Sequence, residues 1–276
     1  MSAPQAASNF YDVRIRRAEN LITANPCAAE ILAIYKHVAS FQKSLHAKIA
    51  QTDGGEARVQ RFGELREAFD VTAVLPYYRS FLAVTEKHGP SALAGAARAM
   101  AELPADAWIE RLTVYWQNGG LPGRDANAFE QFFSRAILEP YAAYVAGRMA
   151  ASPMLETPRV CPMCGAQPLL GVLRPEGDGG KRYMVCAFCG HEWSFRRIWC
   201  AACGEEDEKK LPVYVAEEFP HIRVETCETC KSYLRTIDLT KDGNAVPVVD
   251  DLAAIPLTLW AHAHGYSRLQ PNLFGS

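Results

Sequence analysis

The sequence predicts an α+β fold in which an N-terminal helical bundle precedes two small β-rich metal-binding modules. Three observations predict it. Apolar residues recur at helical spacing through the first half, four Cys-x-x-Cys pairs lie in the C-terminal half, and short strand-like runs separate those pairs. We expect a helical domain over residues 1–152, a first metal module over 153–198 and a second over 199–276, which also holds a C-terminal helix and tail.

The charge balance does not favour a polyanionic partner. The chain has 276 residues and a net charge of −2. Residues 1–150 contain 16 Lys and Arg against 15 Asp and Glu, and the remainder contains 13 against 16. A domain that binds nucleic acid by neutralising phosphates is expected to be basic. We therefore expect no nucleic-acid partner.

The first residues lack the charged opening and apolar core of a secretory signal. No stretch approaches the roughly 18 apolar residues that a spanning helix needs. We therefore expect a cytoplasmic protein with no membrane partner. In a reducing compartment, nine cysteines favour metal binding or redox chemistry over a disulfide framework.

Apolar residues at steps of three and four predict the helices of the first half. The faces are Ile31 to Ile49; Phe62, Leu65 and Phe69 followed by Leu75 to Leu82, with Pro76 as an expected break; Trp108 to Trp116; and Phe129 to Val145. We find no catalytic motif among them and interpret them as the packed core of a bundle. These faces also allow a homodimer. The unpaired Cys27 is interpreted as a small buried or incidental residue rather than a reactive thiolate.

The composition of the sequence changes at residues 151–158, where Pro, Ser and Thr indicate a domain boundary. Short strand-like runs follow at 169–173, 182–185, 193–199, 213–215, 222–225 and 233–239. A final helix is expected from Pro256 to His264, because proline suits a first turn and Gly265 suits the C-terminal cap.

Four cysteine pairs are the candidate functional residues. They are Cys161/Cys164, Cys186/Cys189, Cys200/Cys203 and Cys227/Cys230, and segments of 21, 10 and 23 residues separate successive pairs. Two residues between cysteines let one tight turn present both sulfurs to one metal, at about 2.3 Å for zinc, and a second turn completes the tetrahedron. Glycine follows the first three pairs and tolerates the positive φ of such a turn, whereas Lys231 follows the fourth. This pattern predicts two successive zinc-ribbon-like modules.

Sequential grouping gives the shortest loops, and we choose it among the three groupings that four turns allow. It predicts two tetrathiolate metal ions, with all eight paired cysteines as ligands. Four thiolates suit iron or zinc. Loops of this size bury too little apolar surface to fold alone, and a structural metal adds on the order of 10–16 kcal/mol of apparent binding energy.

Two other functions compete with a metal-centred one. A dithiol redox protein would use the pairs as labile thiols, although redox pairs of the thioredoxin type begin a helix rather than flank hairpins. A nucleic-acid-binding zinc ribbon would use Arg196 and Arg197 beside Trp193 and Trp199. The acidic run over residues 205–208 argues against a continuous basic face.

Several stretches resemble one known family. They are Cys161-Pro-Met-Cys-Gly, Cys186-Ala-Phe-Cys-Gly-His-Glu-Trp, Arg196-Arg-Ile-Trp-Cys, Arg223-Val-Glu-Thr-Cys-Glu-Thr-Cys-Lys-Ser-Tyr and Pro271-Asn-Leu. They are similar to FdhE, the formate dehydrogenase accessory protein family. The resemblance is specific over residues 158–275 and looser in the helical half.

The resemblance implies a non-enzymatic, cytoplasmic accessory protein with rubredoxin-like metal sites. Such a protein assists maturation of a formate dehydrogenase by contacting its catalytic subunit. The family's metal is usually described as iron, which favours iron over zinc here. Its ligand cysteines correspond to the eight paired cysteines of this chain.

Overall fold

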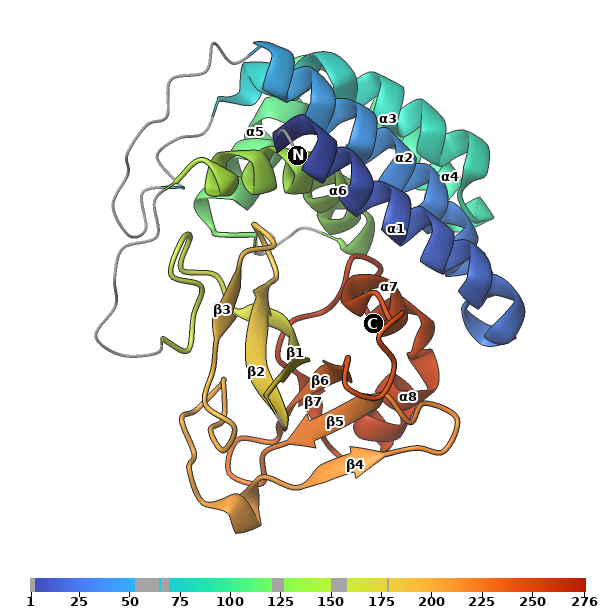
Figure 1. The fold of residues 1–276 in the computed structure, drawn as a ribbon. Helices are drawn as coiled ribbons and strands as arrows, with labels where there is room; N and C mark the ends of the chain where they lie inside the picture. The colour runs from blue at the N-terminus through green and yellow to red at the C-terminus, as the bar shows by residue number, and fades with distance from the viewer. Residues whose placement is uncertain (1–2, 53–64, 66–69, 121–126, 150–157, 178) are drawn as a thin grey trace.

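The computed structural model describes residues 3–52, 65, 70–120, 127–149, 158–177 and 179–276. A layer of packed helices lies against a second layer, in which a twisted sheet is combined with two further helices (Figure 1). The predicted α+β class is confirmed. Among the described residues, no helix is long and apolar enough to cross a membrane.

The helical layer contains α1 (Ala3–Ala24), α2 (Ala29–Thr52), α3 (Leu75–His88), α4 (Ser91–Ala101), α5 (Ala105–Gln117) and α6 (Ala128–Gly147). The predicted apolar faces correspond to α2, α3, α5 and α6, and no face was predicted for α1 or α4. Pro76 lies in the first turn of α3, where its missing N–H costs nothing, so the expected break is instead a helix start. Phe62 and Phe69 lie outside the described residues.

Helix α6 shows how the bundle accommodates an internal proline. Pro140 has no N–H to donate to the carbonyl of Ala136, one turn earlier. The side-chain Nε2 of Gln42, fully buried on α2, donates to that carbonyl at 2.8 Å instead. This hydrogen bond satisfies a buried acceptor and ties α2 to α6.

The strands of the C-terminal half form one sheet. They are β1 (Pro168–Glu176), β2 (Gly179–Cys186), β3 (Glu192–Ser194), β4 (Val213–Val215), β5 (Ile222–Thr226), β6 (Ser232–Asp238) and β7 (Ser267–Arg268). Their order is β3-β2-β1-β6-β5-β4, with β7 also paired to β6. The strand expected over residues 193–199 is wrong beyond Ser194, because the carbonyls of Arg196 and Arg197 accept hydrogen bonds from the Arg182 side chain.

The two halves of the sheet meet where β1 pairs in parallel with β6, over Gly171–Leu173 and Thr236–Asp238. A Cβ on Gly171 would lie 2.3 Å from Oγ1 of the fully buried Thr236. Glycine therefore permits the close approach of the two strands. The predicted boundary at 152/153 lies outside the described residues. The division at 198/199 stays a prediction, and strands from both sides of it share this sheet.

Two helices complete the lower layer, α7 (Pro247–Ala253) and α8 (Ile255–Ala263). The expected C-terminal helix corresponds to α8, and Gly265 follows it with φ of +80°. Helix α7, which the sequence did not reveal, lies between the sheet and α1 (Figure 1). Arg17 of α1 reaches across to it and pairs with Asp250 at 2.6 Å.

Asp251 on α7 is the centre of a buried ionic network. It pairs with Arg235 of β6 and Arg268 of β7, both at 2.7 Å, and accepts a hydrogen bond from Asn272 at 3.1 Å. Both Asp251 and Arg235 are fully buried. Burial raises the pKa of Asp251, but the two guanidinium groups outweigh burial and hold that pKa below its ordinary value.

We expect Asp251→Asn to lower the free energy of unfolding by about 3–5 kcal/mol at pH 7, because it leaves two buried arginines without their counter-charge. Since the folded-state pKa of Asp251 is depressed, its stabilisation is present above the unfolded-state pKa and is lost as pH falls through the folded-state value. Urea unfolding at pH 7 measures the effect.

The matched control is Asp106→Asn, because Asp106 is an exposed carboxylate at the start of α5. This variant should change the free energy of unfolding by less than about 0.5 kcal/mol. A loss at Asp251 no larger than in this control would contradict the network's role.

Candidate metal centres

The four Cys-x-x-Cys turns have the same backbone design. In each, the N–H of the first cysteine donates to the carbonyl five residues later, at 2.8 or 2.9 Å. The acceptors are Ala166, His191, Glu205 and Ser232. Such a closed turn points both thiols of a pair to one side. The repetition shows that each pair is a knuckle rather than the opening of a helix, as the sequence predicted.

The residue after each pair has a positive φ: +74° at Gly165, +69° at Gly190, +84° at Gly204 and +55° at Lys231. Glycine adopts this conformation freely, whereas a side chain costs about 1–2 kcal/mol. Among the described residues, Lys231 is the only non-glycine with positive φ. The fourth knuckle is therefore the strained one.

The structure groups the knuckles sequentially. Cys161, Cys164, Cys186 and Cys189 form a first cluster, and Cys200, Cys203, Cys227 and Cys230 form a second; within each, all sulfurs lie within 4.8 Å of one another. Sulfurs of different knuckles approach to 3.4 and 3.6 Å in the first cluster, and two such pairs lie 3.7 Å apart in the second.

These distances fit a tetrahedral thiolate site. Four sulfurs at about 2.3 Å from a central ion would lie about 3.8 Å from one another. A disulfide would instead need about 2.05 Å, and all eight cysteines are free. The donor set and its spacing therefore suit zinc or iron, and the assignment of the eight cysteines as ligands stays a prediction.

The electrostatics of the first cluster require a cation if all four thiols are to ionise. Burial raises the pKa of Cys186, but hydrogen bonds from the neighbouring thiols outweigh burial and hold it well below its usual range. The same neighbours, together with burial, raise the pKa of Cys189 well above that range. Without a cation, the cluster thus favours one thiolate among thiols. A metal ion supplies the charge that stabilises the remaining thiolates.

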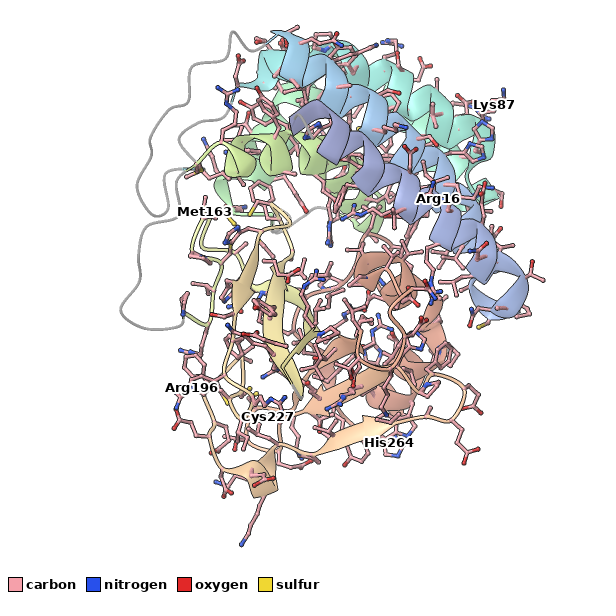
Figure 2. The ribbon with its side chains drawn as sticks, viewed as in Figure 1. Arg16, Lys87, Met163, Arg196, Cys227 and His264 are labelled. Atoms are coloured by element: carbon pink, nitrogen blue, oxygen red, sulfur yellow. The ribbon has the colours of Figure 1, made fainter. Side chains whose placement is uncertain are left out.

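The first cluster is part of the main hydrophobic core. All four of its cysteines are buried. Phe188, between the second pair, packs edge-on against Trp116 of α5 with ring centroids 4.9 Å apart. Met163, between the first pair, is 3% exposed and lies beneath the helical layer (Figure 2). This cluster therefore links the helical layer to the sheet.

The second cluster lies at the opposite end of the sheet, where Figure 2 labels Cys227. Cys203 is exposed and Cys230 is half-buried. Every cysteine of the first cluster is instead buried. Metal at this second site would therefore have weaker shielding from solvent.

Arg182 of β2 connects the segment between the two clusters to the sheet, a role that could not be predicted from the sequence. Its Nη1 donates to the carbonyls of Arg196 and Arg197, and its Nη2 donates to the carboxylate of Glu225 on β5. The side chain is only 5% exposed. It thus fastens the segment between the second and third knuckles to both halves of the sheet.

Other predicted residues have different surroundings from those expected. Cys27 is exposed near the start of α2, so it is not a small buried residue, and its interpretation as an incidental one stays a prediction. Arg196 pairs with Glu206 at 2.7 Å, and Trp199 stacks on Phe195 with centroids 5.1 Å apart. Both side chains thus have partners within the chain, and the absence of a nucleic-acid partner stays a prediction.

A third group of potential ligands, His221, Asp242 and Asp250, is also close together. The guanidinium of Arg17 already lies against both carboxylates, at 2.9 and 2.6 Å. It supplies the positive charge that an ion would bring, so this group serves as a link between α1 and the lower layer.

The fold and the two clusters define a class of protein with a helical domain and paired tetracysteine modules. Comparisons with known proteins agree with that class. Residues 160–197 match the model of the FdhE central domain, and residues 198–274 match that of the FdhE C-terminal domain. The crystal structure of the FdhE protein from Pseudomonas aeruginosa superposes with a TM-score of 0.70 at 26% identity, covering 97% of this chain and 95% of that one.

Curated relatives give the same result. An FdhE homologue from Aquifex aeolicus is 25% identical over 259 residues, which cover 91% of this chain and 90% of the relative. A homologue from Pseudomonas aeruginosa is 37% identical over 125 residues, 43% of this chain and 40% of the relative. Residues 160–274 thus match the two FdhE domains, and the chain as a whole is similar to FdhE proteins in sequence and fold.

We expect a chelator to remove metal in two phases, with the second cluster emptied first. The reason is that Cys203 is exposed, whereas every cysteine of the first cluster is buried. Release into a chromophoric chelator measures both phases. Cys203→Ser should abolish the fast phase and leave the slow one, and Cys27→Ser should leave both unchanged. A single phase releasing both ions, or loss of the slow phase in Cys203→Ser, would contradict the assignment.

Proposed function

We propose that this protein is an accessory factor for the maturation of formate dehydrogenase and that it binds the catalytic subunit of that enzyme through its tetracysteine region. The similarity to the FdhE family carries the proposal. In this proposal the protein acts in the cytoplasm, is not itself an enzyme, and has a helical domain over 1–152 with metal modules over 153–198 and 199–276.

The eight paired cysteines would hold two metal ions, with iron favoured and zinc also suited to the donor set. Bound iron would supply a centre able to exchange one electron, whereas zinc would supply a purely structural cross-link. The surrounding residues hold the sulfurs in place. Burial by Phe188 and Met163 shields the first cluster, and exposure leaves the second within reach of a partner.

The surface beside the second cluster has the features of a contact site. Among the described strands, β4 is an edge of the sheet and pairs with β5 alone. Thr226 donates to the carbonyl of Pro212, so hydrogen-bonded pairs fall at alternate positions, and the backbone groups of Val213 and Val215 point away from β5. Both side chains are about half exposed, at 51% and 49%. Such an edge can pair with an extended segment of another protein.

We expect immobilised protein to retain the formate dehydrogenase catalytic subunit from a lysate. The double variant Cys203→Ser and Cys230→Ser should lose most of that binding, because the exposed cluster would lose its metal and its shape. Cys27→Ser is the matched control and should bind normally. Quantitative mass spectrometry of the retained proteins gives the measurement.

Retention of the subunit by the double variant would contradict binding through the second cluster. No retention by the unaltered protein, together with full formate dehydrogenase activity in a deletion strain, would contradict the proposed function itself. Thiol–disulfide exchange by the metal-free protein would instead favour the dithiol redox alternative, for which the exposed Cys203 is the supporting observation.

A further inference from the structure

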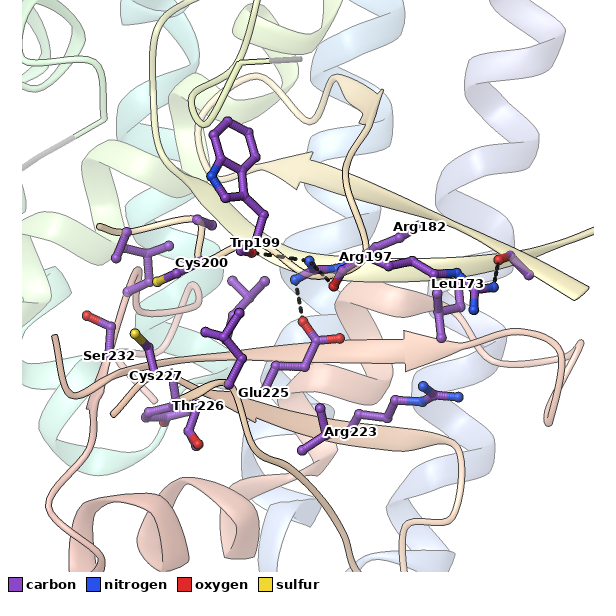
Figure 3. Close-up of a pocket in the computed structure, with 18 of the residues that line it drawn as sticks. Leu173, Arg182, Arg197, Trp199, Cys200, Arg223, Glu225, Thr226, Cys227 and Ser232 are labelled. Atoms are coloured by element: carbon purple, nitrogen blue, oxygen red, sulfur yellow. Dashed lines mark hydrogen bonds and ion pairs between the residues drawn. The ribbon is translucent and has the colours of Figure 1, made fainter. Parts of the chain in front are cut away.

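A cavity of about 190 Å³ lies where the two halves of the sheet diverge, beside the second cluster (Figure 3). Residues from both modules line it, with Leu173 and Arg182 on one side and Glu225 and Leu234 on the other. A site for a single water needs only about 10–15 Å³ by the same measure. The cavity therefore has room for a small organic molecule.

One end of the cavity is rich in guanidinium groups. Arg182, Arg197 and Arg223 line it, whereas Glu225 is the one carboxylate among its lining residues. Arg223 is paired with Asp238 at 2.6 Å, and Arg182 is paired with Glu225. The positive charge of Arg197 therefore has no carboxylate partner at this end of the cavity among the described residues.

Two donors at this end have capacity to spare. Arg197 donates to the backbone carbonyl of Gly180, and no described carboxylate pairs with it. The Nε of Arg182 is buried and has no hydrogen-bond partner among the described residues. A buried guanidinium donor without an acceptor is costly, and an oxyanion is the acceptor that guanidinium groups bind best.

The opposite end suits an apolar body. Leu211, Val213 and Leu234 contribute to the wall. Leu173 instead lies beside Arg197 at the arginine end (Figure 3). Figure 3 shows Cys200 and Cys227 on the far side of Glu225 from the arginines. A tetrathiolate metal site carries net negative charge, so an anionic head would lie at the arginine end and the apolar part would extend toward the cluster.

We propose that this cavity binds a compact organic anion, with its carboxylate or phosphate on Arg197 and Arg182 and its apolar body against the leucine side chains. The site goes beyond the proposed accessory function and does not depend on it. Pockets of this kind combine a largely apolar wall with a few convergent polar groups.

Isothermal titration of the metal-loaded full chain with benzoate and with phenyl phosphate tests the proposal and separates the two headgroups. The neutral isostere benzamide should bind at least about tenfold more weakly, because it lacks the charge-assisted hydrogen bond. Arg197→Gln should weaken binding of the anion by about tenfold or more. Arg197 is exposed, so this variant should fold normally.

The matched control is Arg196→Gln, since the neighbouring Arg196 is paired with Glu206 and does not line the cavity. It should bind the anion as the unaltered protein does. No saturable binding of either anion at millimolar concentration would overturn the proposal. Equal binding of benzamide, or equal losses in the two arginine variants, would overturn the role of charge at this cavity.

Discussion

The arrangement of the C-terminal half depends on two clusters, each of which brings four cysteine sulfurs close together. Crowded thiols do not ionise together, as the opposite pKa shifts of Cys186 and Cys189 illustrate. A cation removes this conflict. The knuckles, the positive-φ residues after them and the hairpins between them all serve to present sulfurs to one point, in segments with little core of their own.

The two clusters share a backbone design but differ in their surroundings. The first lies within the hydrophobic core, where Phe188 and Trp116 tie it to the helical layer. The second faces solvent at the sheet edge beside β4 and the cavity. The buried ion would thus cross-link layers, while the exposed site is the one open to other molecules. Arg182 connects the segment between the two clusters to both halves of the sheet through its carbonyl contacts and Glu225.

Local features were predictable from the sequence because their signals are local. The spacing of the cysteines predicted the sequential grouping, and apolar periodicity predicted α2, α5 and α6. Long-range features were not predictable. The parallel pairing of β1 with β6 joins segments more than 60 residues apart, and its only trace is Gly171 inside a strand. Polar side chains such as Arg182 and Asp251 acquire their roles only when distant carbonyls and charges surround them.

The metal content of protein purified without oxygen tests the central claim most directly, with elemental analysis and visible absorption measured on the same sample. We expect two ions per chain, with thiolate-to-iron charge-transfer bands if both are iron. A variant in which serine replaces the four cysteines of the second cluster should contain one ion. Protein that contains little metal, or whose paired cysteines are linked by disulfides, would contradict the account.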